Sequence, residues 1–395
     1  MSKKIKISGV GCSLVDRLYK VSFSNDSYQP FLSKQSGDGG LTPGQLVFRE
    51  EFEKFANEDF NTALPKLTNN QQPVKINIGG PSIVSLIHAS QITDNDNIEF
   101  CFYGNRGDDD DGNFIISLLE KTKINTDNYT KSNAETPSTV VLSDDDFDNG
   151  NGERMFINSI GAAWDFTPEN LDEAFFDSDI VVFGATALVP NIHDNLTELL
   201  KKAKVKNCIT IVNTVYDFRN EKAAPDIKWP LGNSDESYAN IDLLMTDLEE
   251  ALRLSGKGNL NDAMQFFQER KTGSVIVTCG AQNVHLFSLG KLFKTLEHST
   301  MPVSKLVTEK LKTDNSGDTT GCGDNFAGGV IASLAKQLQN EDRTSDLTEA
   351  CSWGIVSGGT TCFYMGGMFE EKQKGEKLNR IMPFYTEYKK QFTGF

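Results

Sequence analysis

Short apolar runs alternate with amphipathic stretches along most of this chain. Apolar runs bounded by turn residues are typical of buried strands, and apolar residues three and four positions apart are typical of helices that cover a sheet. The predicted strands are 4–12, 73–78, 99–103, 179–183, 208–213, 241–245 and 274–278. The predicted helices are 49–57, 79–90, 191–204, 247–254, 259–269 and 345–363. Strands that alternate with helices form a parallel sheet through right-handed crossovers, so we expect an α/β fold.

Two segments depart from this alternation. Residues 136–146 and 152–159 alternate apolar and polar side chains about an acidic, asparagine-rich turn, which is typical of two neighbouring strands with one polar face. Residues 24–72 are first glycine-rich and then charged, and Gly37 lies in their glycine-rich part. This segment fits two interpretations equally well, a loop over the mouth of a functional site or a solvated excursion.

Composition narrows the class of partner. The 395 residues suffice for a large core, as one big α/β domain or as two domains. The net charge is −16 and the acidic residues are spread along the chain, which argues against nucleic acid or an anionic membrane as a partner. A neutral polyol is the easier substrate on that ground.

The cysteines and the hydropathy of the chain indicate a reducing cellular compartment. Seven cysteines occur without CxxC spacing and without metal-like spacing to the four histidines, which predicts reduced thiols. No window approaches about 20 consecutive apolar residues, and the first residues, MSKKIKISGVG, lack a cleavage-site pattern. The expectation is a cytoplasmic protein.

The most informative stretch is 312–338, KTDNSGDTTGCGDNFAGGVIASLAKQL. The glycines at 321 and 323 precede an apolar run that predicts a helix, so the amides of Gly321, Cys322 and Gly323 are expected to converge on an anion at the helix start. A carboxylate such as Asp324 repels an anion, so its presence here indicates a function. The function that fits is a general base that accepts the proton of a hydroxyl. Taken alone, these residues also fit a glycine-rich helix cap with no ligand.

The longer string DTTGCGDNFAGG closely resembles the C-terminal signature of the ribokinase-like (PfkB) carbohydrate kinases, DTTGAGDxFxGG, with Cys322 in place of alanine. The resemblance implies a three-layer α/β/α fold with a central, mostly parallel sheet and a small β-sheet lid. It implies phosphorylation of a hydroxyl by ATP with Mg²⁺, and it leaves K⁺ activation open. In this family pattern Asp318, Thr319 and Thr320 belong to the nucleotide side. One domain over residues 1–395 is expected, with a lid from about 13–24 and 136–160 and an insertion at about 24–72.

The resemblance also assigns the acceptor side. Asp16 stands where the family binds a pair of sugar hydroxyls, and a carboxylate suits that task because it accepts two hydrogen bonds at once. Gly79 and Gly80 match the glycines of the family motif GGxxxN, but its asparagine position falls on Val84. Ala163 replaces the asparagine of a family GAN motif that follows GERMF. Two missing amides predict a less polar or differently shaped acceptor pocket.

On the nucleotide side, TDLEEALRLSG resembles the family's NxxEAxxLxG. Glu250 matches the glutamate that holds waters of the Mg²⁺ ion, and Asp247 stands where asparagine is usual. The alternative for both is a pair of helix-start carboxylates. Thr278 and Gly280, in TCGAQN, match a turn that sits against the nucleotide.

Two further expectations concern loops. The four aspartates at 108–111 are expected to cap a helix, and Arg106 to pair with them rather than with substrate. Gly366 and Gly367, which follow the predicted helix 345–363, are expected at the rim of the adenine pocket by resemblance.

The predicted function is therefore ATP-dependent phosphorylation of a sugar or sugar-like alcohol. A nucleoside kinase is an alternative, because adenosine kinases share the signature. A catalytically idle sugar or nucleotide sensor is an alternative from another class, supported only by Val84 and Ala163. No Walker A pattern occurs in the chain. By resemblance the lid edges of two copies are expected to pair into a homodimer.

Overall fold

The computed structural model describes residues 3–35, 37–93, 97–150, 152–314, 316–340 and 344–393. Its main sheet is parallel except at one edge. The strands are β1 (Ile5–Val10), β5 (Ile98–Gly107), β6 (Ile124–Asn125), β7 (Tyr129–Ser132), β10 (Ile180–Gly184), β11 (Ile209–Asn213), β12 (Leu243–Asp247), β13 (Ser274–Thr278), β14 (Val284–Ser288) and β15 (Leu296–Met301). They lie in the order β15-β14-β13-β12-β11-β10-β1-β5-β6, with β7 also paired to β5. Only the pairings β13–β14 and β14–β15 in this sheet are antiparallel.

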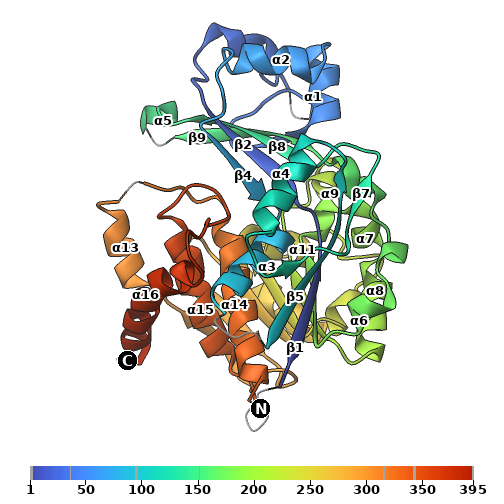
Figure 1. Cartoon of the computed structure of the whole chain (residues 1–395), viewed down its shortest axis with the longest axis vertical. Helices are drawn as coiled ribbons and strands as arrows, with labels where there is room; N and C mark the ends of the chain where they lie inside the picture. The colour runs from blue at the N-terminus through green and yellow to red at the C-terminus, as the bar shows by residue number, and fades with distance from the viewer. Residues whose placement is uncertain are drawn as a thin grey trace.

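Helices cover both faces of this sheet because successive strand residues point to opposite sides. In β10, Ile180 and Val182 join one apolar core, whereas Val181 and Phe183 join the other. The first core is covered by α3 (Pro81–Gln91), α4 (Asp110–Leu119), α13 (Lys305–Leu311), α14 (Cys322–Leu338), α15 (Leu347–Thr361) and α16 (Glu376–Thr393). The second is covered by α6 (Glu173–Phe176), α7 (Pro190–Asp194), α8 (Leu196–Val205), α10 (Glu236–Ala239), α11 (Leu248–Ser255) and α12 (Leu260–Glu269). The expected three-layer α/β/α architecture is confirmed (Figure 1).

A second, smaller sheet lies above one end of the main sheet (Figure 1). Its strands are β2 (Leu14–Lys20), β3 (Leu46–Phe48), β4 (Lys75–Gly79), β8 (Ser138–Asp144) and β9 (Glu153–Ser159), in the order β3-β9-β8-β2-β4. The strand register aligns Asp16 with Asn77 and Thr139, and Thr139 with Asn158, so these four polar residues share one face.

The opposite face of the small sheet is apolar and is covered by residues 24–72, here named the cap segment. The cap segment contains α1 (Arg49–Ala56) and α2 (Phe60–Leu67), and Tyr28, Phe31 and Phe52 are buried against Leu142 and Met155. Both interpretations made from the sequence are therefore wrong. The segment has a core of its own, and it packs on the face away from Asp16.

The acidic run at 108–111 caps a helix as expected. Asp109 is the N-cap of α4 and accepts a hydrogen bond of 2.8 Å from the amide of Gly112. The expectation for Arg106 is met in part. Its buried guanidinium lies over the Tyr129 ring and donates to Gly107 O. Against the opposing effect of burial, hydrogen bonds from Thr136 and Gly112 and then the charge of Arg106 lower the pKa of Asp109. The ion pair with Asp111 is formed by Arg17.

The two labelled chain ends lie at the end of the molecule remote from α1 and α2 (Figure 1). Within the described ranges, no helix combines the length and the apolar character that crossing a membrane requires.

Candidate active site

The start of α14 is shaped by glycine. Gly321 is the N-cap with a φ of +75°, and a Cβ added to it would lie 2.4 Å from the Cα of Gly367. Only glycine fits such a position without displacing backbone. The amides of Gly323 and Asp324 lie in the first helical turn, where amides have no intrahelical acceptor. The Cys322 amide makes a long hydrogen bond of 3.3 Å to Thr319 O, so an anion would have to displace that bond.

Two carboxyl groups, those of Asp324 at the start of α14 and Asp16 in the small sheet, lie close enough for the charge of Asp324 to act on Asp16. Burial raises the pKa of Asp324 to about 7. The pKa of Asp16 is also raised to about 7, first by burial and then by the negative charge of Asp324. A Cβ on Gly79 would lie 2.2 Å from Oδ2 of Asp16, and Gly80, at φ +102°, would meet Cys12 O at 2.2 Å. The structure thus brings together the predicted base and the predicted acceptor residues.

Amide side chains that the sequence pattern did not single out lie on the same face of the small sheet. Asn77 donates to Met368 O at 3.3 Å, and Asn158 donates to Thr139 Oγ1 at 2.9 Å. The alternation of these asparagines with apolar residues in β4 and β9 could have shown from the sequence that they lie on the polar face of the small sheet. They place two amides on the sheet face that carries Asp16.

The expectation that Gly366 and Gly367 form the rim of the adenine pocket stays a prediction. A Cβ on Gly366 would meet Asn77 Nδ2 at 2.3 Å, and one on Gly367 would meet Val84 at 3.3 Å. Neither residue lines the apolar cavity described below. The loop after α15 therefore packs between the acceptor side and the start of α14, where it supports Gly321.

Arg154 links the small sheet to the loop before α14. Its Nη1 donates to Thr320 Oγ1 at 3.1 Å, and its Nη2 lies 3.9 Å from Oδ2 of Asp318. Asp318 in turn accepts from the amides of Thr320 and Gly366. This guanidinium places a positive charge beside the predicted phosphate site. The sequence did not point to Arg154, because its partners are more than 160 residues away.

A buried lysine lies behind the start of α14. The ammonium of Lys377 is 2.8 Å from Oδ1 of Asn325, and burial lowers the pKa of Lys377 to about 7. Asn325 Nδ2 donates to Gly321 O at 2.8 Å and to Gly367 O at 2.7 Å. Asn325 therefore joins the two glycines that form the turn, and Lys377 helps to fix its orientation together with the Tyr364 hydroxyl, which donates to the same Oδ1 at 3.1 Å.

Replacing Lys377 by methionine is expected to lower turnover while leaving the fold intact, because Asn325 loses one of the two donors to its Oδ1. Misplacement by about 1 Å can cost about 10²-fold in rate, so we expect kcat to fall by between about 10-fold and 10²-fold. Steady-state kinetics on samples matched by circular dichroism check this. Lys257→Met, on an exposed residue, is the control. An unchanged kcat in Lys377→Met would contradict the positioning role.

An apolar cavity of about 380 Å³ adjoins the start of α14. Thr278 and Gly280 line one side, and Thr319, Cys322 and Gly323 line another. The apolar wall comes from Val307 and Leu311 of α13, Phe326 of α14, Ile355 of α15, Val284 of β14 and Val303 before α13. Such a wall suits a planar heterocycle placed beside a polar anchor.

Asp247 and Glu250 form a capping box at the start of α11. The Glu250 amide donates to Asp247 at 2.8 Å, and Glu250 accepts from Thr214 and Thr246. Burial, followed by the charge of Asp247, raises the pKa of Glu250 to about 7. A divalent cation held through water would offset the negative charge of the two carboxylates. The pair therefore fits the binding of Mg²⁺, and it also fits its role as the capping box of α11. The described residues contain no cluster of three metal-binding side chains.

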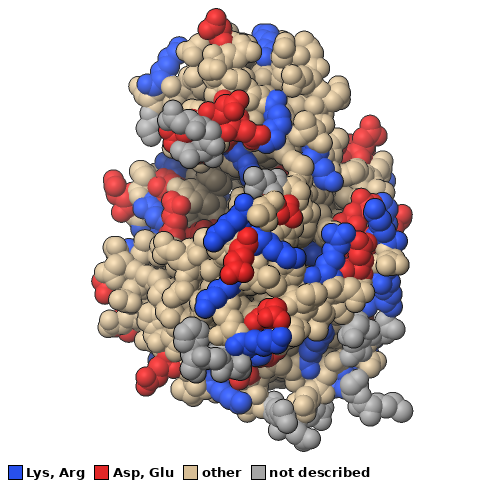
Figure 2. Space-filling model, turned by 90° about the vertical axis from the view of Figure 1, so that its left-hand side faces the viewer, with Lys and Arg blue, Asp and Glu red and all other residues tan. Residues whose placement is uncertain are grey.

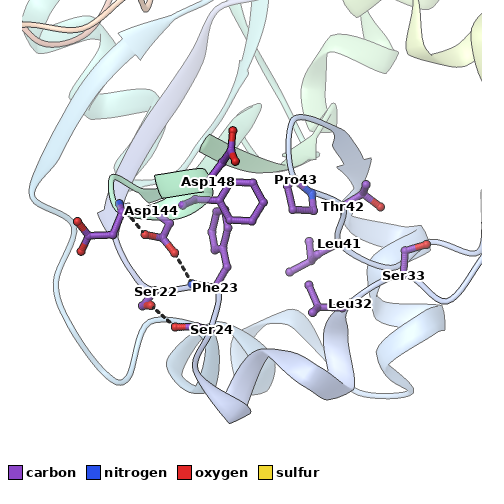
Figure 3. A pocket seen from close by; sticks show the side chains of 12 residues that line it. Ser22, Phe23, Ser24, Leu32, Ser33, Leu41, Thr42, Pro43, Asp144 and Asp148 are labelled. Carbon is purple, nitrogen blue, oxygen red and sulfur yellow. Dashed lines mark hydrogen bonds between the residues drawn. The ribbon is translucent and has the colours of Figure 1, made fainter. Parts of the chain in front are cut away.

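A separate cavity of about 480 Å³ lies between the cap segment and the turn after β8. Figure 3 shows Leu32 and Leu41 of the cap segment on one side of it and Phe23 on another. The Phe23 amide donates a hydrogen bond to the Asp144 carboxylate. None of the predicted site residues lines this cavity. It is therefore unrelated to the carboxyl pair.

The molecular surface is hollowed between the small-sheet end and the main body (Figure 2). On the face shown, lysine and arginine side chains are interspersed with acidic ones. This distribution suits a small ligand in a cleft better than an extended polyanion.

Comparisons with known proteins agree with this geometry. Residues 57–373 match the profile of the pfkB family carbohydrate kinases. A fructokinase of Vibrio alginolyticus is 25% identical over 288 residues, which cover 71% of this chain and 85% of that protein.

Solved structures match over nearly the whole chain. Anopheles gambiae adenosine kinase in complex with P1,P4-di(adenosine-5) tetraphosphate has a TM-score of 0.65 at 19% identity, covering 91% of this chain and 95% of that one. A candidate ribokinase II from E. coli in complex with ATP and Mg²⁺ has a TM-score of 0.64 at 17% identity, covering 98% and 99%. At these identities the structural matches establish a common fold.

Proposed function

Because this chain belongs to the pfkB family of carbohydrate kinases, we propose that it transfers the γ-phosphoryl group of ATP to a hydroxyl of a sugar, with Asp324 as the general base. The observation that carries the proposal is that the carboxyl of Asp324, at the start of α14 and next to residues that line an apolar cavity, acts electrostatically on that of Asp16 in the small sheet. The acceptor would lie against Asp16, Gly79 and Gly80.

The transfer itself needs positioning and charge stabilisation. Phosphoryl transfer places the attacking and leaving oxygens roughly in line, with charge on the oxygens between them. Asp324 would accept the proton of the attacking hydroxyl, while the amides of Gly321, Cys322 and Gly323 and the positive end of α14 hold the developing charge. Asp16 would fix the acceptor by taking hydrogen bonds from two of its hydroxyls.

The nucleotide would occupy the apolar cavity with its phosphates toward α14. Thr278, Gly280 and Thr319 line the cavity, and Arg154 contacts Thr320 and Asp318 in the loop before α14. Asp247 and Glu250 would hold Mg²⁺ through water, and the cation supplies neutralisation of phosphate charge.

Profiling of acceptors tests the proposal. Sugars, polyols and nucleosides would be incubated with ATP and Mg²⁺, with and without K⁺, and both ADP and phosphorylated product measured. A ketose such as fructose is the first candidate, since the curated relative is a fructokinase, and adenosine is the matched nucleoside. If only nucleosides gave a phosphorylated product, the acceptor would be a nucleoside and not a sugar. Binding of ATP and sugar with no product from any acceptor would favour an idle sensor.

The pH profile follows from the two raised pKa values. Asp324 acts as a base only when deprotonated, and Asp16 accepts two hydrogen bonds only when deprotonated. Both have a pKa of about 7, so kcat/KM is expected to fall as the pH drops below 7 and to level off above it. The limiting slope should lie between about one and two, and Asp16→Asn should reduce it to about one. A flat profile through pH 7 would contradict Asp324 as the base.

A further inference from the structure

Two cysteines from different helices meet in the wall of the nucleotide cavity. Cys322 is the first residue of α14, and Cys362 directly follows α15. Their sulfurs lie 3.4 Å apart, and both residues line the cavity. Neither thiol has been used by the proposed mechanism, which needs only the backbone amide of Cys322.

These two residues differ from the other cysteines in access and proximity. Cys12, Cys101, Cys208 and Cys351 are buried, and Cys279, Cys322 and Cys362 are half-buried. Among the described cysteines, only Cys322 and Cys362 are in mutual contact. An oxidant that entered the cavity would therefore meet one thiol with a second thiol already beside it.

The backbones that carry the two sulfurs are held closely together. Helices α14 and α15 lie side by side (Figure 1), and a Cβ on Gly358 would approach Cys322 O to 2.9 Å. On the other side, a Cβ on Gly317 would lie 2.3 Å from Cys362 O, and Asp318 donates its amide to Tyr364 O. Glycine at 358 and at 317 thus permits a close approach that keeps the sulfurs in contact.

The contact also activates one of the thiols. The pKa of Cys362 is lowered to about 7, chiefly because the Cys322 thiol donates a hydrogen bond to its sulfur. The pKa of Cys322 is raised by the same bond and then by burial. A partly exposed thiolate next to a second thiol is the usual environment of a redox-sensitive cysteine.

We propose that Cys322 and Cys362 form a reversible oxidative modification site, in which a peroxide converts the pair to a disulfide that turns off phosphoryl transfer. This proposal extends the proposed kinase function to its regulation, and it rests on that function only for its effect on turnover.

The chemistry needs one equivalent of peroxide. The Cys362 thiolate attacks one peroxide oxygen, so an S–O bond forms, the O–O bond breaks and hydroxide leaves, giving a sulfenic acid. The Cys322 sulfur then attacks the sulfenic sulfur, so the S–S bond forms and the S–O bond breaks. Two thiols and hydrogen peroxide thus give a disulfide and two waters, with sulfur oxidised and peroxide reduced.

Bond formation would disturb the anion site directly. The sulfurs must approach from 3.4 Å to about 2.05 Å, and we expect the start of α14 at Cys322 to shift with them. Since Cys322 is the first residue of α14, a shift there displaces the helix start that the proposed mechanism uses, and a shift of about 1 Å is enough to cost about 10²-fold in rate. A thiol reductant would restore the original arrangement.

The test treats the full chain with hydrogen peroxide and maps its disulfides by peptide mass spectrometry, a readout that needs no kinase activity. The expected result is a single Cys322–Cys362 bridge, a fall in free thiols from seven to five and reversal by dithiothreitol. In the same samples, turnover should drop more than about 10-fold and recover with the reductant. Independent sulfinic acids, or no bridge, would overturn the proposal even if the protein is an active kinase.

Variants separate the bridge from general oxidative damage. Cys362→Ser should form no bridge. Peroxide treatment should remove only a small fraction of the activity that this variant has before treatment. Cys279→Ser removes the other half-buried thiol and should behave as the unmodified chain does. Thermal unfolding of each reduced variant checks that it is folded. A bridge that forms while ATP turnover is unchanged would overturn the regulatory role and leave the kinase function standing.

Discussion

Replacing Asp324 by asparagine is expected to lower kcat by a factor on the order of 10² to 10⁴ with the best acceptor, the usual contribution of general-base catalysis. The amide has nearly the same shape but accepts no proton from the attacking hydroxyl. ATP affinity should change little, because no proposed contact to the nucleotide involves this side chain. Steady-state kinetics and ATP titration by calorimetry measure the two quantities.

A contrasting variant separates the base from the acceptor contact. Asp16→Asn keeps Asp324 and should raise the KM for the acceptor more than it lowers kcat, because it weakens binding rather than proton transfer. If Asp324→Asn turned over at the unmodified rate, or if it abolished ATP binding, its assignment as a base would be wrong.

The second large effect concerns Gly321. Alanine at this position must adopt a φ of +75°, and its Cβ would lie 2.4 Å from the Cα of Gly367. The turn has to open, which displaces the amides of Cys322 and Gly323 from the phosphate. Loss of one such donor typically costs about 10² to 10³ in kcat, and Gly321→Ala is expected to fall in that range.

The matched control is Gly37→Ala in the cap segment. Gly37 has a φ of +78°, but a Cβ there meets nothing within 4 Å. It therefore carries the same left-handed backbone strain, about 1 kcal/mol, without a clash and away from the site. Activity of Gly37→Ala should match that of the unmodified chain. Equal losses in the two variants would point to general strain instead of displaced amides.

The sequence was informative where local patterns decide the structure. Apolar runs identified the six central parallel strands β1, β5 and β10–β13, because a buried parallel strand must be apolar on both faces. The edge strands β6, β7, β14 and β15 were missed, and the predicted strand 73–78 is β4 of the small sheet. The glycines before the apolar run at 325–335 located the start of α14, because a left-handed turn requires that residue type. Asp324 could be recognised there as a carboxylate in an otherwise anion-binding turn.

The sequence was uninformative where distant segments meet. Arg154 reaches Thr320 across 166 positions, and Asn77 meets Met368 across 291, so no local pattern records either contact. Lys377 looks like an ordinary charged helix residue until α16 buries it behind Asn325. The cap segment was misjudged for a related reason, since its apolar residues acquire meaning only when they pack on the small sheet.

A crystal structure with a non-hydrolysable ATP analogue and the best acceptor tests the central claim most directly. We predict the analogue in the cavity between α13, α14 and α15, with its terminal phosphate at the amides of Gly321, Cys322 and Gly323. One acceptor hydroxyl should lie about 2.6–3.2 Å from Asp324 and in line with the terminal phosphorus, and two others should contact Asp16. An acceptor bound elsewhere, for example in the cavity beneath the cap segment, with Asp324 facing solvent or an unrelated partner, would contradict the account.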